Sequence, residues 1–332
     1  MTAFTIGTEE IPRGARKTVE LPISFLANNT PINLPVHVIH GTEPGPVLFI
    51  SGVVHGDEVL GVEIVRRVTQ HPGLKRLSGT LLAVPIVNAF GFLNHSRYMP
   101  DRRDLNRSFP GSDQGSLASL LADLFMNEVV LRSEYGIDLH TAALHRSNLP
   151  QIRIAPDEPE LMALAEQFSP PVILVSKLRD GTLRQCARDN GVKMLLYEAG
   201  EALRFDETAI EIGVRGILNV MASLNMIVPL RAAKEAPAPA ISHSSAWLRA
   251  PEGGILRSAI DIGARVTKDA VIGEISSPLG DLSVAIIAED DGIVVGRTNL
   301  PVVNRGDALF HVARMKQAET EQAPLFDEDE II

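Results

Sequence analysis

The stretch Pro46–Glu63, PVLFISGVVHGDEVLGVE, decides the fold of this 332-residue chain. Its apolar run, residues 47–54, stops at the tetrapeptide His55–Glu58, and apolar residues then recur at helical spacing as far as Val68. This pattern predicts a buried parallel strand, a tight turn and an amphipathic helix. In open α/β sheets, functional groups gather at the carboxyl ends of the strands, which is where this turn lies.

The turn carries two side chains that suit a metal ion. His55 and Glu58 are three residues apart, so a turn that enters a helix can aim both at one point, although such a pair alone is weak evidence. The segment Tyr135–Thr141, YGIDLHT, reads as a second short buried strand with Asp138 and His140 at its end. A buried histidine is more often a hydrogen-bonded core residue, but this position makes His140 a good third ligand. Two histidines and one glutamate leave the fourth position of zinc open.

Strands and helices alternate between residue 46 and about residue 226, which predicts an α/β fold with a mostly parallel sheet covered by helices on both faces. Further strands are expected at residues 79–87, 152–155, 172–175 and 193–197, and further helices at residues 117–131, 158–168, 183–189 and from Asp206 to about Met226. We assign residues 1–231 to this domain. Its first 45 residues read as strands and turns.

The remainder of the chain differs in composition and in the length of its predicted strands. Residues 232–245, AAKEAPAPAISHSS, are rich in Pro, Ala and Ser and read as a linker. Short strands joined by Gly and Asp turns then predict an all-β sandwich or barrel domain at residues 246–315. Residues 316–332 hold six acids, and the stretch after Lys316 carries −6 of the formal net charge of −10, which predicts a solvated acidic tail.

Composition limits the possible partners. The chain is 45% hydrophobic with a mean hydropathy of +0.10, which indicates a globular protein. No apolar run reaches the roughly 18 residues of a membrane span, and the N-terminus lacks the features of a signal peptide. The acidic charge argues against nucleic acid, which requires a basic face. With a single cysteine, Cys186, these features favour the cytoplasm, and a homo-oligomer remains open.

A polar loop, residues 94–112, interrupts the core-forming region with four arginines. Composition alone favours a solvated charged loop. However, Asp104, Asn106 and Arg107 stand around an apolar Leu105, and an arginine fork beside an asparagine amide suits a planar carboxylate.

In order, these pieces are HGDE at residues 55–58, RY at 97–98, DLNR at 104–107 followed by FPG, DLHT at 138–141 and YEAG at 197–200. The set resembles the succinylglutamate desuccinylase/aspartoacylase family, which is related to the zinc carboxypeptidases. The resemblance covers roughly residues 40–230. It implies one zinc ion per chain and hydrolysis of the amide bond of a small N-acyl amino acid, an amidohydrolase activity on linear amides.

The resemblance also implies roles for single residues. The expected zinc ligands are His55, Glu58 and His140. Glu198 would be the catalytic acid/base, with Glu201 as the fallback. Asp104 would hold a ligating imidazole in one tautomer, as partners of metal-bound histidines usually do.

Substrate contacts are expected from the arginine-rich loop. Asn106 and Arg107 would hold the carboxylate of the substrate, and Arg97 would polarise the scissile carbonyl. Because Arg97 stands ten residues before Arg107, further than expected for aspartoacylase itself, Arg102 or Arg103 could take that role instead.

Two other functions compete with deacylation. A carboxypeptidase-type metallopeptidase would use the same metal and base, but the compact catalytic region and the appended β domain favour small substrates. A non-catalytic binding protein on the same fold is disfavoured because all three ligands and Glu198 are retained. The identity of the acyl group is left open by the sequence.

Overall fold

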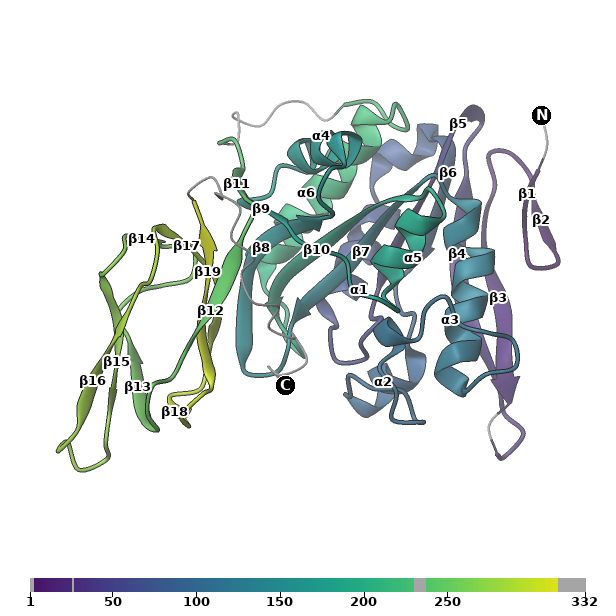
Figure 1. The fold of residues 1–332 in the computed structure, drawn as a ribbon. Helices are drawn as coiled ribbons and strands as arrows, with labels where there is room; N and C mark the ends of the chain where they lie inside the picture. Colours follow the sequence, from purple (N-terminus) through teal and green to yellow (C-terminus); the bar gives the residue numbers. More distant parts are fainter. Residues whose placement is uncertain (1–2, 26, 230–236, 316–332) are drawn as a thin grey trace.

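The computed structural model describes residues 3–25, 27–229 and 237–315, and a large mixed β-sheet forms its centre (Figure 1). In spatial order, the strands of this sheet are β12 (Ser245–Arg249), β19 (Ala308–Arg314), β17 (Gly292–Thr298), β8 (Arg146–Ile154), β10 (Lys193–Glu201), β7 (Tyr135–Ala142), β5 (Glu43–Gly52), β6 (Ser78–Val84), β4 (Pro31–His40) and β3 (Arg16–Phe25). Off this path, β9 (Val172–Val175) pairs with β8, β11 (Ala240–Ser242) with β9, and β14 (Arg265–Val266) with β17. Two short strands, β1 (Phe4–Ile6) and β2 (Glu9–Ile11), pair with each other.

The sheet is mixed and not mostly parallel as we expected, because its parallel pairs lie among its central strands and between β8, β9 and β11. Strands β10, β7, β5 and β6 run parallel to one another, whereas β8 is antiparallel to β10 and β4 is antiparallel to β6. The connection from β7 to β8 explains part of this difference. It spans only residues 143–145, too short for a parallel crossover, so β8 has to run back along the sheet.

Helices pack on the sheet in two groups. The helices are α1 (Leu60–Thr69), α2 (Ala89–Asn94), α3 (Leu117–Glu128), α4 (Pro159–Phe168), α5 (Leu183–Asp189) and α6 (Glu207–Ser223), with the short 3₁₀ turns η1 (Pro72–Arg76), η2 (Leu105–Arg107) and η3 (Val130–Arg132). Apolar residues of α1, α4 and α6 share a core with Leu48 and Ile50, whereas those of α3 and α5 share a core with Phe49. Successive side chains of β5 therefore pack into different cores, because they point to opposite faces of the sheet.

The long helix α6 begins where the sequence predicts. Asp206 stands in extended backbone before the helix, and its side chain accepts a hydrogen bond of 3.0 Å from the backbone N–H of Ala209. None of the helices in the described residues combines the length and the apolar character that a bilayer span requires.

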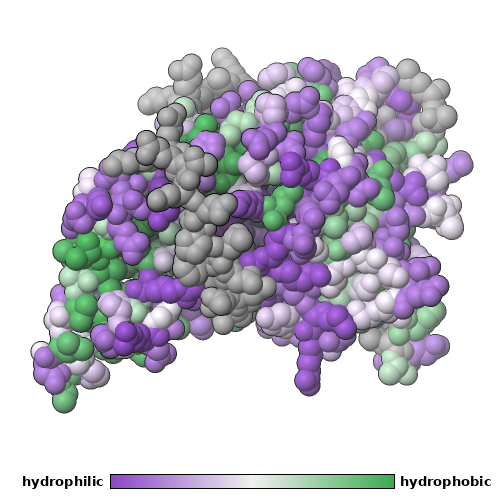
Figure 2. All heavy atoms as spheres, viewed as in Figure 1, coloured by the Kyte–Doolittle hydropathy of each residue, from purple (hydrophilic) through white to green (hydrophobic). Residues whose placement is uncertain are grey.

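The C-terminal strands form a second, antiparallel sheet. Its order is β16 (Ser283–Ile287), β15 (Val271–Ser276), β13 (Gly254–Ser258) and β18 (Val302–Val303). It packs on β17 and β19 through apolar residues such as Ile275, Val294 and Phe310. On the outside of this sheet, the ladder partners Val271 and Ile287 are exposed, and Figure 2 shows hydrophobic residues gathered over this part of the molecule.

Some of the C-terminal strands pair with the large sheet. Strand β17 is hydrogen-bonded to β8, so the sheet that carries the catalytic candidates continues into the C-terminal strands. Strand β11 falls within the stretch that we interpreted as a linker, and it extends the sheet next to β9. Residues 230–236 and the predicted acidic tail, residues 316–332, lie outside the described residues.

Candidate metal and catalytic site

The structure brings the three predicted ligands together at the carboxyl ends of β5 and β7. His55, Glu58 and His140 offer nitrogen and oxygen atoms that all lie within 4.8 Å of one another. Their exposed fractions are 4%, 3% and 4%. Because β5 and β7 are parallel neighbours, the turn after β5 and the end of β7 meet at one edge of the sheet.

The turn that carries His55 and Glu58 has a strained residue before it and packs closely against α2. Val53 adopts φ +58°, which is strained for a β-branched residue, and its carbonyl accepts a 2.8 Å hydrogen bond from the N–H of Asn88. A Cβ on Gly56 would stand 2.0 Å from the carbonyl carbon of Gly91 in α2. Only glycine therefore lets the turn lie directly against α2.

Hydrogen bonds orient both imidazoles in the same way. Nδ1 of His55 lies 2.6 Å from Glu58 Oε1, and Nδ1 of His140 lies 2.8 Å from Glu58 Oε2. On the other side of each ring, Nε2 of His140 is 2.7 Å from Asp138 Oδ2, and Nε2 of His55 is 3.2 Å from Asp104 Oδ1. When the imidazole is neutral, a carboxylate beside Nε2 keeps the proton there, so that the lone pair of Nδ1 can face a cation in place of the hydrogen bond to Glu58.

The charges of the cluster are strongly coupled. Burial alone would lower the pKa of His140, but the carboxylates of Asp138 and Glu58 outweigh it and raise that pKa well above its usual range. Burial would likewise raise the pKa of Glu58, yet the charges of His55 and His140 hold it well below its usual value. The buried carboxylates thus stay ionised beside positive charge. A metal cation can supply that charge in place of the imidazole protons.

Asp138 is a functional candidate that we noted only as a neighbour of His140. Its side chain is 1% exposed, and its second oxygen, Oδ1, accepts a 2.6 Å hydrogen bond from the Ser51 hydroxyl. The signal was present in the sequence as Asp-Leu-His. Residues two apart on a strand point to the same face, which places the carboxylate beside the imidazole.

Of the three arginines considered for the scissile carbonyl, Arg97 reaches the ligands. Its Nε and Nη2 donate to Asp104 Oδ2 at 3.2 and 2.9 Å. Its Nη1 lies 3.3 Å from His55 Nδ1 and 3.4 Å from Glu58 Oε1. Arg102 and Arg103 are exposed.

The short turn η2, which follows Asp104, links the ligand cluster to α5. Asn106 uses its side-chain oxygen to accept a 2.9 Å hydrogen bond from the N–H of Leu183, the first residue of α5. Arg107 donates one guanidinium N–H to the backbone oxygen of Asn106 at 2.8 Å. Asn106 therefore has a structural contact beyond the substrate contact that we predict for it.

The two candidate bases occupy different surroundings. Glu198 lies directly opposite His140 in the β10–β7 ladder, so both side chains leave the same face of the sheet. Glu201 lies further along β10, where it accepts hydrogen bonds of 2.9 Å from the N–H of His145 and 3.0 Å from the side chain of Asn299. This arrangement favours Glu198 over Glu201 as the residue that works beside the ligands.

Strand β8 adds polar residues that sequence reasoning did not single out. Asn148 donates a 2.7 Å hydrogen bond to Glu198 Oε2, and Arg153 Nε lies 3.9 Å from Glu198 Oε1. Gln151 is fully buried and stands opposite Glu198 in the ladder. For Gln151 and Arg153, the alternation Gln-Ile-Arg-Ile at residues 151–154 was the available signal, because polar residues at every second position of a strand share one face.

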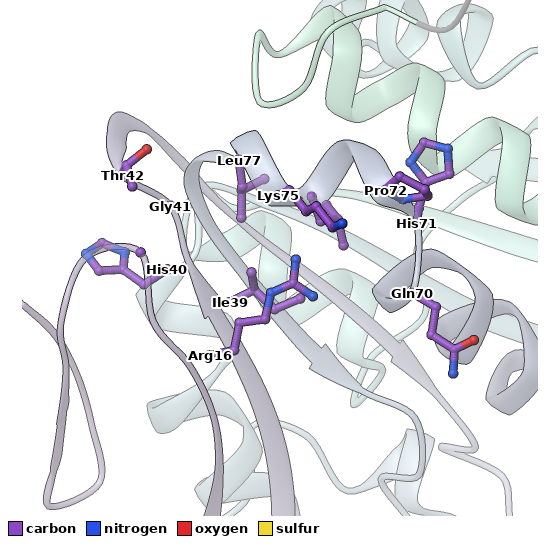
Figure 3. A pocket seen from close by; sticks show the side chains of 12 residues that line it. Arg16, Ile39, His40, Gly41, Thr42, Gln70, His71, Pro72, Lys75 and Leu77 are labelled. Carbon is purple, nitrogen blue, oxygen red and sulfur yellow. The ribbon is translucent and has the colours of Figure 1, made fainter.

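A separate cavity of about 520 Å³ lies at the other ends of the central strands (Figure 3). Its lining includes Arg16 at the start of β3, His40 at the end of β4, and His71 and Lys75 at the turn η1. Since the ligand cluster lies at the carboxyl ends of the parallel strands, this cavity is not the site described above.

Similarity to known proteins agrees with this geometry. The N-alpha-acetyl-L-2,4-diaminobutyric acid deacetylase of Halomonas elongata is 25% identical over 299 residues, which cover 86% of this chain and 87% of that protein. A succinylglutamate desuccinylase/aspartoacylase structure from Rhodobacter sphaeroides matches with a TM-score of 0.78 and 25% identity, covering 91% of this chain and 96% of that one. The product-bound ectoine utilization protein EutE of Ruegeria pomeroyi matches with a TM-score of 0.80 and 21% identity, over 90% and 95% of the two chains, and shows likeness of fold.

The model of the succinylglutamate desuccinylase/aspartoacylase catalytic domain matches residues 44–224, more than half of the chain. These residues include the His55–Glu58 turn, the η2 segment, His140 and Glu198. The chain belongs to the succinylglutamate desuccinylase/aspartoacylase family.

Proposed function

We propose that this protein is a zinc-dependent hydrolase that removes the acyl group from a small N-acyl amino acid. The observation that carries the proposal is the convergence of two imidazoles and one carboxylate, all buried, with Glu198 opposite His140 on the neighbouring strand. The names of the family and of the Halomonas elongata deacetylase support deacylation of an amino acid.

The donor set fits zinc. Two neutral imidazoles and one glutamate are a known ligand set of catalytic zinc, which keeps a further position open. Asp138 and Asp104 hold the opposite ring nitrogens, so His140 and His55 need no rearrangement of tautomer to act as ligands. Zinc held by these residues supplies a Lewis acid that activates water and polarises a carbonyl.

The protein groups then divide the remaining chemistry. Glu198 takes a proton from the attacking water and returns it to the leaving amine, the paired role of a general base and acid. The guanidinium of Arg97, which reaches the ligand cluster, stabilises the negative charge that develops on the carbonyl oxygen. The products are a carboxylic acid and a free amino acid.

The substrate class follows from the η2 segment. In this proposal, Arg107, together with Asn106, binds a free carboxylate close to the scissile amide. A guanidinium can make two parallel hydrogen bonds to a carboxylate, which favours an N-acyl amino acid over a neutral amide.

Metal analysis and a substrate panel test the proposal. Purified protein should hold about one zinc per chain. His140→Ala should lose most of it, because the affinity for zinc depends on every ligand. The panel compares N-acetyl, N-succinyl and N-acyl diamino acids with short peptides. Hydrolysis of peptides alone would make the protein a peptidase, and zinc retention by His140→Ala would remove His140 from the ligand set.

The role of Glu198 has its own test. Glu198→Gln should retain zinc and lower kcat by about two to four orders of magnitude, the contribution expected of a general acid/base. Glu201→Gln is the matched control. If Glu201→Gln lost activity while Glu198→Gln remained active, Glu201 would be the base.

A further inference from the structure

The carboxylate of Glu198 is held by strand β8. Asn148 donates its amide N–H to Oε2 at 2.7 Å, while the guanidinium Nε of Arg153 lies 3.9 Å from Oε1. The side chain of Glu198 is 13% exposed and Asn148 is 8% exposed, so both groups are shielded from solvent. A hydrogen bond to an ionised carboxylate is among the stronger ones in proteins, and burial keeps water from replacing it.

The ladder registers explain how Asn148 reaches this position. Asn148 stands opposite Gly200 on β10, and the register is irregular between Glu198 and Gly200. Glu198 itself stands opposite Gln151, three residues from Asn148, so regular alternation would not bring the two side chains together. The hydrogen bond between them therefore depends on this irregularity.

On its other side, Asn148 faces the C-terminal strands. Its ladder partner on β17 is Gly296. A Cβ added to Gly296 would stand 2.9 Å from Asn148 Oδ1 and 3.2 Å from the Cβ of His311. The missing side chain at residue 296 therefore leaves the space in which the amide of Asn148 lies.

We propose that Asn148 is a positioning residue for Glu198, and that Gly296 in the C-terminal strands makes this possible. The amide holds one carboxylate oxygen, so the glutamate side chain does not need to be ordered anew in each turnover. The C-terminal strands thereby influence the position of Glu198, because the amide of Asn148 lies in the space beside Gly296. This inference rests on the proposed role of Glu198.

The test measures kcat and KM on an N-acyl amino acid with the full-length, zinc-loaded protein. Asn148→Ala should lower kcat by about ten- to a hundredfold and change KM by less than about twofold, because the base and not the substrate contact is disturbed. Zinc content and the midpoint of thermal unfolding should stay close to those of the wild type. Gly296→Ala, a change within the C-terminal strands, should lower kcat in the same direction, because the added Cβ would stand 2.9 Å from Asn148 Oδ1.

A double-mutant cycle separates positioning from a merely structural role. If Asn148 acts through Glu198, adding Asn148→Ala to Glu198→Gln should change kcat by less than about twofold. The control is Asn299→Ala, which removes hydrogen bonds to Ser147 and Glu201 at the same junction but none to Glu198.

Three outcomes would overturn the inference. These are a loss in the Glu198→Gln background as large as in the wild type, an equal loss of kcat in Asn299→Ala, or unchanged kcat in both Asn148→Ala and Gly296→Ala. Failure of the proposed function looks different, because the wild type would then be inactive on the panel or Glu198→Gln would stay active.

Discussion

Replacing Asp138 tests how the protein prepares the proposed metal site. Asp138 Oδ2 lies 2.7 Å from Nε2 of His140, and Oδ1 accepts a 2.6 Å hydrogen bond from Ser51. Asparagine has the same shape. Its amide can present oxygen to the imidazole and nitrogen to the Ser51 hydroxyl, so Asp138→Asn keeps both contacts and removes only the negative charge.

The expected magnitude follows from the position of that charge. Asp138 is 1% exposed, so solvent screens it little, and the charge makes His140 a more basic ligand. Loss of such a partner typically lowers metal affinity about 10- to 100-fold, or roughly 1.4–2.7 kcal/mol. Asp138→Ala should lose more than Asp138→Asn, because it also leaves Nε2 of His140 without this acceptor.

Competition for zinc with a coloured chelator at fixed pH measures the affinity directly. Asp123→Asn on α3 is the matched control, since that aspartate accepts a hydrogen bond from Asn127 and none from a ligand. Thermal unfolding of the metal-free proteins shows whether the fold is retained. Unchanged zinc affinity in a folded Asp138→Asn protein would refute the argument that this carboxylate prepares His140 for a metal.

Three further changes test other parts of the structure. Gly56→Ala places a Cβ 2.0 Å from backbone of α2, so it should lower the free energy of unfolding in urea by about 1–3 kcal/mol or more, whereas Gly253→Ala, with nothing nearer than 3.5 Å, should not. Hydrogen bonds from Arg66 hold the pKa of Glu63 at about 2, below its ordinary 4.5, so the stabilisation is complete above pH 4.5 and is lost as the pH falls toward 2. The difference in unfolding free energy between wild type and Glu63→Gln should therefore narrow over that range, and a difference independent of pH would contradict this assignment. Arg107→Lys should lower kcat/KM about ten- to a hundredfold for an N-acyl amino acid and much less for the matching amino amide, and equal losses would mean a structural role.

The sequence by itself determined the local pieces of this protein. The apolar run before His55, the helical spacing after Glu58 and the cap at Asp206 are patterns between near neighbours, and near neighbours fix strands, turns and helix starts. The predicted ligand set could also be recognised from local patterns, because polar residues at the ends of apolar strands are conspicuous in the sequence. The cytoplasmic location and the separate C-terminal domain remain predictions of the sequence.

Only the tertiary structure decided how these pieces meet. The antiparallel course of β8 depends on which strands pair across the sheet, and pairing is a property of distant segments. The contact of Asn148 with Glu198 and the space left by Gly296 follow from that pairing, so neither residue could be recognised from its neighbours in sequence. The position of Arg97 was likewise decided by folding, because the loop brings Arg97 to Asp104 and His55, whereas Arg102 and Arg103 are exposed.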